Sequence, residues 1–330
     1  MNTPPATPVS FGQALKFWLW LGCVSFGGPA GQIALMHEEL VVRRRWISEQ
    51  RYLHALHYCM LLPGPEAQQL ATYIGWLMHR ARGGMAAGVL FVLPSLLLLI
   101  GLSWAYVTWG QHPWGQALLW GLKPAVTALV LQAVHRMARR TLQRPWLWGL
   151  AALSLAGTLA GIGFPWLVAL AAIAGAAVAR ALPSASPAHS AKSNEASAPA
   201  WIDDQTPTPP HARYSLGRLL RAAGMGVGLW ALTLGGLAWL LGAEHTLVRM
   251  GGFFTEAALL TFGGAYAVLP YVTQAAVTHY GWLSAAQMMD GLALGETTPG
   301  PLIMVVAFVG FVGGHGQALN RPGFQGGWLV

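Results

Sequence analysis

The chain has 330 residues, of which 55% are hydrophobic and 9% are charged, and its mean hydropathy is +0.47. Soluble globular proteins carry about 25% charged residues, so this composition excludes an ordinary soluble protein and predicts a membrane protein. The net charge of +8 does not indicate a nucleic-acid partner, because the basic residues form short clusters beside apolar segments, as the positive-inside rule describes. Cys23 and Cys59 stand alone and predict neither a disulfide framework nor a metal site.

Apolar segments long enough to cross a bilayer, which takes roughly 17–25 residues, follow one another along the chain. We expect an all-α polytopic membrane protein with spans at 84–108, 115–135, 146–161 with 164–180, 219–242, 249–272 and 286–312. Segments 11–36 and 52–79 are also apolar, but each is interrupted.

The interruption in 52–79 is the motif Pro63-Gly64-Pro65. Proline lacks a backbone donor and glycine is a poor helix former, so no continuous helix should pass through it. Pro299-Gly300-Pro301 interrupts a later apolar run in the same way. Two such breaks predict a common structural purpose.

An internal repeat relates the two motifs, which lie 236 residues apart. The same offset carries Phe26-Gly27-Gly28 onto Phe262-Gly263-Gly264, Trp46 onto Trp282 and Ser48 onto Ser284, without a gap. We therefore predict that the chain is a duplication. Val330 corresponds to position 94 of the first copy, so the second copy is expected to be incomplete.

A change of composition separates the two copies. Residues 183–213 are rich in proline and poor in apolar side chains, which predicts a disordered cytoplasmic linker. We thus expect an N-terminal membrane half at 1–182 and a C-terminal half at 214–330.

The charges of two equivalent loops predict opposite orientations for the two halves. Loop 37–51 contains four arginines, whereas the matching loop 273–287 contains no lysine or arginine. By the positive-inside rule, the first loop is cytoplasmic and the second external, so the halves have inverted topology. Segments 11–36 and 52–79 then either dip into the membrane and return as re-entrant half-helices, which we favour, or cross it fully.

Helix breaks at membrane depth survive only where they line a cavity or pack against protein, and paired breaks in inverted halves indicate a transport site. New helices begin after Pro65 and Pro301, and the glycines of the other two motifs, Gly27, Gly28, Gly263 and Gly264, permit close backbone approach. Helix N-termini bind anions. We therefore predict that four half-helix ends surround one small anion; the alternative is that the breaks are kinks that help packing.

These motifs carry a family resemblance. FGGPAG at 26–31, LPGPEAQQLATYIGW at 62–76 and GGMAAGVLFVLP at 83–94, with FGGAYAVLP at 262–270 and TTPGP at 297–301, resemble the signature segments of the chromate ion transporter family in its long two-domain form. The resemblance implies an inner-membrane transporter that exports chromate from the cytoplasm and gives chromate resistance, with sulfate as the structural analogue. It also implies a longer C-terminus than this chain has.

Three ionisable residues within apolar segments are candidates for function. Glu66 follows the first break directly, and either carries a coupling proton, seals the site, or only stabilises the helix dipole. Glu296, just before the second break, has a similar claim. Lys123 is a natural counter-charge for an oxyanion, unless its side chain reaches back to the interface.

Polar residues beside the breaks could hydrogen-bond an oxyanion, although each alone is more readily explained by helix packing; they are Ser25, Gln68, Gln69, Thr261, Thr297 and Thr298. His54 and His57 have a spacing that is only a weak sign of a metal or haem. His54 and its equivalent Asp290 are expected near a membrane interface.

The sequence predicts a secondary transporter rather than an enzyme, with no cofactor and no catalytic residues. The chain contains no Walker A pattern, so an ion gradient or the membrane potential must drive transport. Oxyanion uptake and a channel remain alternatives, and a membrane redox enzyme is a more distant one. The sequence leaves open chromate against sulfate, the coupling ion, the direction of transport and whether the chain forms a homodimer.

Overall fold

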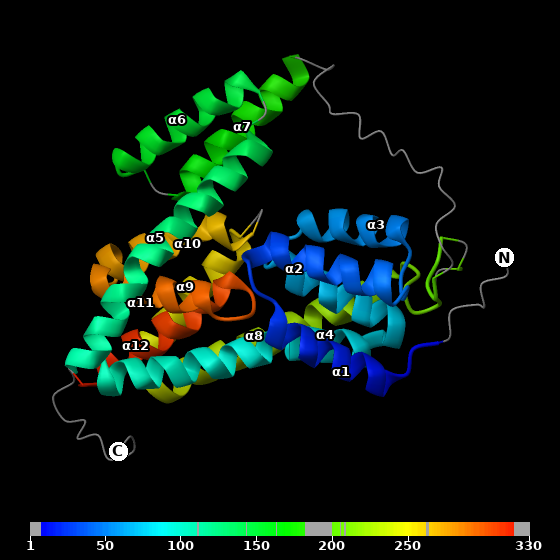
Figure 1. Ribbon diagram of the computed structural model, residues 1–330, viewed down its shortest axis with the longest axis horizontal. Helices are drawn as coiled ribbons and strands as arrows, with labels where there is room; N and C mark the ends of the chain where they lie inside the picture. The colour runs from blue at the N-terminus through cyan, green and yellow to red at the C-terminus, as the bar shows by residue number, and fades with distance from the viewer. Residues whose placement is uncertain are drawn as a thin grey trace. The chain divides into compact units, whose positions relative to one another are not determined.

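The computed structural model describes residues 8–110, 112–142, 144–162, 164–181, 200–204, 206–207, 209–261 and 264–319. These residues form helices joined by short connections, and their β pairing is one isolated bridge between Ile47 and Ile202 (Figure 1). The expected all-α fold is therefore confirmed. The chain divides into two compact units, Met1–Lys123 with Ser197–Val330, and Pro124–Ala196.

The first copy of the repeat lies in the larger unit. Its elements are the helices α1 (Phe11–Val24), α2 (Gly28–His37), the π-helical turn η1 (Glu38–Arg43), α3 (Glu49–Met60) and α4 (Glu66–Trp109). The predicted breaks thus separate α1 from α2 and α3 from α4.

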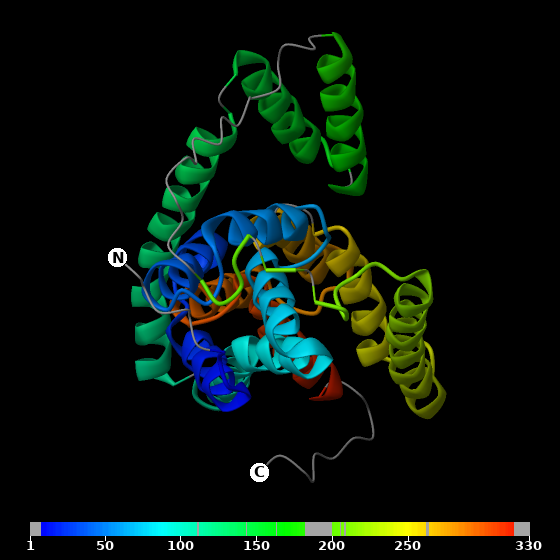
Figure 2. The same ribbon diagram turned by 90° about the vertical axis from the view of Figure 1, so that its right-hand side faces the viewer.

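Helix α4 is not straight, because His79 and Arg80 have non-helical backbone angles. The chain turns there into two arms that pack against each other (Figure 2). Glycine makes this contact possible: a Cβ on Gly75 would lie 2.6 Å from the Gly83 carbonyl oxygen, and one on Gly88 would lie 2.6 Å from the Thr72 hydroxyl. The arm that starts at the Pro63-Gly64-Pro65 break is therefore one half of a tight helical hairpin.

The second copy follows with the same order of elements. They are α9 (Thr246–Leu259), α10 (Ala265–Gln274), η3 (Ala275–His279), α11 (Ala285–Thr297), η4 (Leu302–Met304) and α12 (Val305–Leu319), preceded by α8 (Leu216–Leu241). The predicted spans 249–272 and 286–312 each contain two helical segments, separated where the glycine and proline motifs predict a break.

Local structure repeats at the 236-residue offset. Ser48 caps α3 and Ser284 caps α11. The Trp46 amide donates to the Leu40 carbonyl at 2.8 Å, and the equivalent Trp282 amide donates to the Ala276 carbonyl at 2.8 Å. A π-helical turn precedes each of these tryptophans. The local backbone structure therefore agrees at these equivalent positions, while the duplication of the whole chain and the inverted orientation of the halves in a membrane stay predictions.

The two larger of the three buried cores among the described residues correspond to the two copies. The first is built from α1 to α4 and contains Phe17, Trp18 and Phe91. The second is built from α9 to α12, with Phe253 and Phe308, and it also includes Leu99 of α4. The second arm of α4 therefore runs from one core into the other.

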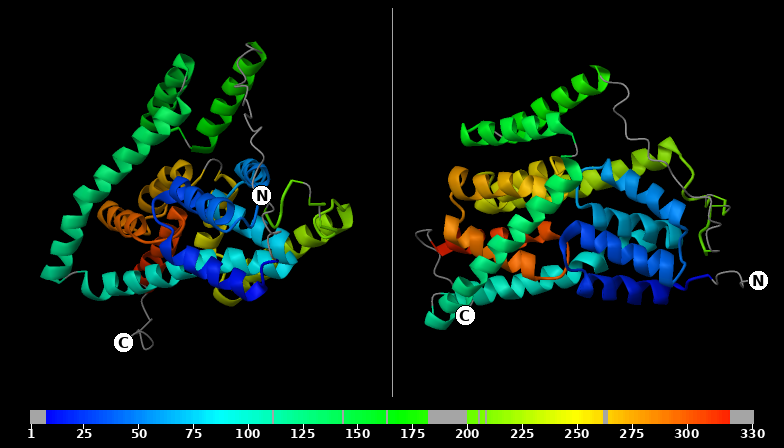
Figure 3. Two further views of the ribbon diagram at one scale, coloured as in Figure 1. Left: turned by 45° about the vertical axis from the view of Figure 1, so that its right-hand side comes forward. Right: turned by 45° about the horizontal axis from the view of Figure 1, so that its top comes forward.

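Residues 200–214 dock on the first copy (Figure 3). The Trp201 amide donates to the Arg45 carbonyl at 3.0 Å, the Ser48 amide donates to the Ile202 carbonyl at 2.9 Å, and the Ser48 hydroxyl donates to Asp204 at 2.6 Å. The described residues of this range, called the docking segment below, do not form the disordered linker that we predicted, because β-bridge and side-chain bonds fix them. Residues 183–199 of that predicted linker lie outside the described residues.

Two described helices, α4 and α8, are long and apolar enough to cross a membrane. The smaller unit contains α6 (Pro145–Leu159) and α7 (Phe164–Ala181), where predicted, and they pack together with Leu167 over Gly157. Helix α5 (Pro113–Thr141) extends across the boundary between the units.

Candidate functional site

The helices of the two copies begin in two different ways. Four helices are capped by a side chain that accepts a hydrogen bond from a backbone N–H group of the first turn. The capping residues are Ser10 for α1, Ser48 for α3, His245 for α9 and Ser284 for α11. The helices that begin at the breaks have no such cap: α2 starts after Gly27, α4 after Pro65, α10 after Gly264 and η4, which leads into α12, after Pro301. Since first-turn N–H groups have no partner within a helix, each of the four breaks presents backbone N–H donors that can bind a ligand.

Two reciprocal hydrogen bonds join the breaks of the two copies. The Gly64 amide donates to the Thr261 carbonyl at 2.7 Å, and the Gly300 amide donates to the Ser25 carbonyl at 2.7 Å. The 236-residue offset that relates Gly64 to Gly300 also relates Ser25 to Thr261. Each proline-glycine break therefore holds the phenylalanine-glycine break of the other copy.

The two phenylalanine-glycine breaks also approach each other. A Cβ on Gly28 would lie 3.2 Å from the Tyr266 hydroxyl, and one on Gly264 would lie 3.7 Å from Pro29. Both glycines have a positive φ, of 69° and 93°, which L side chains rarely adopt. Phe262 and Gly263 lie outside the described residues, so the predicted role of Gly263 stays a prediction.

Buried polar side chains gather around the breaks. The Gln69 amide donates to the Pro63 carbonyl at 2.6 Å, and the Gln32 amide donates to the Ser25 carbonyl at 3.5 Å. Within the described part of the chain, four buried oxygens beside these bonds find no hydrogen-bond partner, namely Ser25 Oγ, Gln32 Oε1, Gln69 Oε1 and Ser95 Oγ. Buried polar atoms normally have a partner, so this cluster is suited to a polar ligand or water.

Two carboxylates flank the breaks, as the sequence predicts. Glu66 is buried at the first position of α4. Glu296 is half-buried in the last turn of α11 and hydrogen-bonds Tyr266, the residue whose hydroxyl lies beside Gly28. Glu296 is thus linked through one side chain to the Phe26-Gly27-Gly28 break.

Other predicted residues are placed less centrally. The backbone of Lys123 lies in α5, but its side chain is outside what the structure describes. Thr297 is exposed and bonds the Ala293 carbonyl of its own helix. His54 is exposed, whereas its equivalent Asp290 is buried and accepts a hydrogen bond from Tyr106 at 3.0 Å. The expectation that both lie near a membrane interface stays a prediction.

Sequence reasoning missed Gln32, Ser95 and Tyr266. Ser95 follows Pro94 in an otherwise apolar run, and its Cβ would lie 2.4 Å from a Cβ on Gly300. A single polar residue after a proline in an apolar segment was the available signal. Gln32 and Tyr266 gave no comparable signal, because only the fold places them at the breaks.

No group of three metal-ligating side chains occurs among the described residues. His54 and His57 are therefore not part of such a group there. The geometry instead offers backbone N–H groups, hydroxyls and side-chain amides, which together suit a small anion better than a cation.

Comparison with known proteins agrees with the motifs. The family model described as "Chromate transporter" matches residues 12–176 and 248–329. The chain is 33% identical to the "Chromate transport protein" of Pseudomonas aeruginosa over 314 residues, 94% of this chain and 68% of that protein. It is 31% identical to the "Chromate transport protein" of Cupriavidus metallidurans over 302 residues (91% and 67%). It is 30% identical to the "Probable chromate transport protein" of Synechococcus elongatus over 305 residues (92% and 69%). No solved structure matches the chain.

Proposed function

The chain belongs to the chromate transporter family, and is thus a membrane transport protein rather than an enzyme; from this premise we propose that it exports chromate from the cytoplasm across the inner membrane as a multi-pass secondary transporter. The observation that carries the proposal is the meeting of four uncapped helix starts, joined by the bonds from Gly64 to Thr261 and from Gly300 to Ser25.

Chromate is a tetrahedral dianion, and the breaks supply what such an ion needs. First-turn N–H groups and the positive ends of the helix dipoles favour negative charge. The Ser25 and Ser95 hydroxyls lie beside these starts and can donate to the anion. The Gln32 and Gln69 amides donate instead to the Ser25 and Pro63 carbonyls and help to position the breaks. We assign the binding of the anion to the first-turn backbone N–H groups that follow Gly27, Pro65, Gly264 and Pro301, with the Ser25 and Ser95 hydroxyls completing its shell. Gly64 and Gly300 hold these helix starts together through their bonds to Thr261 and Ser25.

The carboxylates have a different role in this proposal. A fixed negative charge next to a dianion repels it, so Glu66 and Glu296 are assigned to carrying a coupling proton or to sealing the empty site. Glu296 is suited to either role because it bonds Tyr266, whose hydroxyl lies beside Gly28. Lys123 remains a proposed counter-charge for the anion.

The membrane potential can drive export without another ion. Moving one charge across 100 mV is worth about 2.3 kcal/mol, so a dianion that leaves a negative-inside cell gains roughly 4–5 kcal/mol. We propose that the two copies, in inverted orientation, rock about the reciprocal bonds and open the breaks to each side in turn.

The test is chromate flux in everted membrane vesicles that contain this chain, with the membrane potential clamped or collapsed and with sulfate as competitor. We expect saturable, potential-dependent accumulation that sulfate inhibits. Flux that never saturates and shows no counter-flow would indicate a channel, and absence of flux from correctly inserted protein would contradict the proposal.

A further inference from the structure

A groove runs along α3 toward the Pro63-Gly64-Pro65 break. One cavity, of about 340 Å³, is lined by Gln50, Arg51, His54, Tyr73, Leu77, Asp204 and Ala212. A second, of about 820 Å³, shares His54, Tyr73 and Ala212 and extends to Leu62, Gln68 and Gln69, beside the break. The shared residues make the two cavities consecutive parts of one groove.

One face of α3 supplies the polar wall of this groove. Arg51, His54 and Tyr58 are spaced three and four residues apart, which places them on the same side of the helix. All three line the groove, Arg51 at its outer end and Tyr58 nearer the break. A ligand that follows this face moves from a cationic end toward the uncapped start of α4.

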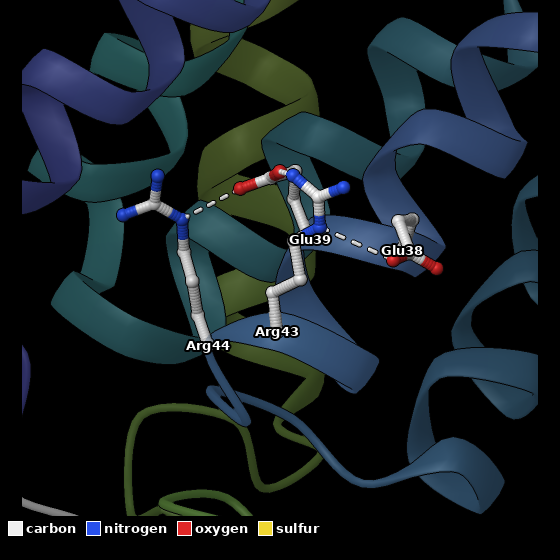
Figure 4. A network of polar contacts seen from close by, with 4 residues as sticks. All are labelled: Glu38, Glu39, Arg43 and Arg44. Atoms are coloured by element: carbon white, nitrogen blue, oxygen red, sulfur yellow. Dashed lines mark hydrogen bonds and ion pairs between the residues drawn. The ribbon is translucent and has the colours of Figure 1, made fainter.

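Arg51 differs from its neighbours in how its charge is compensated. Arg43 contacts Glu38 and Glu39 at 3.1 and 3.0 Å, and Arg44 contacts Glu39 at 3.0 Å (Figure 4). Arg51 makes no ion pair among the described residues and donates instead to the Thr206 carbonyl of the docking segment. Its charge is therefore available to an anion in the groove.

The carboxylate in the same cavity, Asp204, forms no ion pair with Arg51 among the described residues. Asp204 accepts the Ser48 hydroxyl at 2.6 Å. The docking segment thus lies at the outer end of the groove, with His211 bonded to the Trp76 carbonyl at 3.0 Å, and it covers the groove without neutralising Arg51 by contact.

The second copy lacks this arrangement of charge. At the 236-residue offset, Gln287 stands where the first copy has Arg51, and Asp290 stands where it has His54. Asp290 is buried and bonds Tyr106. The same scaffold is therefore cationic at one end and carries a carboxyl group at the equivalent place in the other copy.

We propose that Arg51 and His54 form a second, cytoplasm-facing binding site that captures a tetrahedral dianion of the chromate and sulfate class before it reaches the breaks. The site rests on the proposed function for its place in transport. Its absence from the second copy makes the two entrances differ in affinity, because the anion is collected at the Arg51 end and is not held at the Asp290 end, while the membrane potential and the concentration gradient set the direction of net flux.

The first experiment measures the dependence of chromate flux on chromate concentration in everted vesicles, where the cytoplasmic face meets the medium. Arg51→Gln introduces the side chain of the equivalent Gln287 and should raise KM roughly tenfold, with the maximal rate nearly unchanged. Arg221→Gln is the matched control, because Arg221 is exposed and bonds only the Gly217 carbonyl of its own helix in the described structure; its KM should not change. Equal effects of the two variants would overturn the capture site and leave a general surface-charge effect.

The second experiment does not need transport. Gln50→Cys, in a chain with Cys23→Ala and Cys59→Ala, places one thiol in the outer cavity, and its reaction with a membrane-impermeant maleimide is followed in everted vesicles. Sulfate is the probe, because chromate oxidises thiols. Sulfate should slow labelling relative to chloride at equal ionic strength, and Arg51→Gln should abolish the protection.

The outcomes separate the two proposals. Protection by sulfate without chromate flux would support the capture site and contradict the proposed function. Flux without protection, or with equal protection in Arg51→Gln, would contradict the capture site alone. Labelling of Gln50→Cys in right-side-out vesicles but not in everted ones would overturn its cytoplasmic position.

Discussion

The two copies of the repeat share a backbone and differ in charge. Each has a π-helical turn, a serine cap and a buried tryptophan that contacts an equivalent phenylalanine, Phe17 with Trp46 and Phe253 with Trp282. Arg45 and Gly281 occupy the same turn with φ of 52° and 60°. Yet the positions of Arg51 and His54 hold a glutamine and an aspartate in the second copy.

This difference separates the backbone features that both copies supply to the shared site from the charged side chains that only one copy supplies. The bond from Gly64 to Thr261 and the bond from Gly300 to Ser25 are reciprocal, so a change in either copy alters the break of the other. Side chains away from the breaks are not coupled in this way. The backbone can therefore define the site while the charges define its two entrances.

The strongest test of the shared backbone is Gly300→Ala compared with Gly64→Ala. Both glycines have positive φ, 108° and 124°, where an L side chain costs about 1–2 kcal/mol. At Gly300 the new Cβ would also lie 2.4 Å from Ser95 Cβ, whereas at Gly64 it would lie 2.7 Å from the movable Gln69 amide. We expect Gly300→Ala to lower chromate flux per inserted molecule roughly 100-fold, since misplacing binding groups by about 1 Å has effects of that size, and Gly64→Ala to lower it less.

Gly101→Ala is the control, because a Cβ at this glycine of α4 meets nothing within 4 Å. Combining Gly300→Ala with Ser95→Gly removes the close contact and should restore part of the flux. If both break variants transport like the unmodified protein, the half-helix site is wrong.

A smaller effect is expected from Tyr266→Phe, which tests a contact present in one copy. The offset places Ala30 at the equivalent position, so only the second copy offers a hydroxyl between Gly28 and Glu296. A hydrogen bond to a carboxylate is worth about 1.5–3 kcal/mol, and we expect chromate flux to fall roughly tenfold.

Tyr271→Phe is matched to this variant, because Tyr271 lies on the same helix and donates to Glu256 at 2.9 Å, outside the breaks. It should leave flux nearly unchanged. Equal losses in both variants would mean that any tyrosine-glutamate bond on α10 supports the fold, and that Tyr266 has no special place at the site.

The sequence predicted the features that depend on backbone chemistry. The proline and glycine motifs placed all four breaks, because these residues act locally on helix formation. The offset paired Ser48 with Ser284, and the structure shows that both are helix caps. Tyr266 could not be found, because its contact with Gly28 joins segments that are far apart in the chain. Gln32 bonds Ser25 only seven residues away, but nothing in its sequence surroundings distinguished it from other polar residues. The docking segment was misjudged for a related reason: its composition is that of a linker, and its order comes from bonds to Arg45, Trp46 and Ser48.

The buried hydroxyls of Ser25 and Ser103 differ in whether the protein satisfies their hydrogen bonds. Ser25 Oγ is buried and has no hydrogen-bond partner among the described residues, whereas the equally buried Ser103 donates to the Leu99 carbonyl at 2.6 Å. Ser25→Ala should therefore raise the KM for chromate about fivefold, since one hydrogen bond contributes about 0.5–1.5 kcal/mol, without lowering thermal stability in detergent. Ser103→Ala should leave KM unchanged. The reverse pattern would place the anion away from Ser25 and the Phe26-Gly27-Gly28 break.

The smallest expected effect concerns the docking segment, which lies at the Ser48 end of the first copy. Asp204→Ala removes the acceptor of the Ser48 hydroxyl but leaves the main-chain bonds of Trp201 and Ile202 in place. The segment should therefore stay docked on average and open more often, and the maleimide reaction of Gln50→Cys should become about threefold faster, which is what losing part of one hydrogen bond allows. Glu244→Ala, an exposed acid in a connection before α9, is the control and should not change the rate. An unchanged rate in Asp204→Ala would mean that the main-chain bonds alone keep the groove covered, and that entry to the Arg51 end requires the whole segment to move.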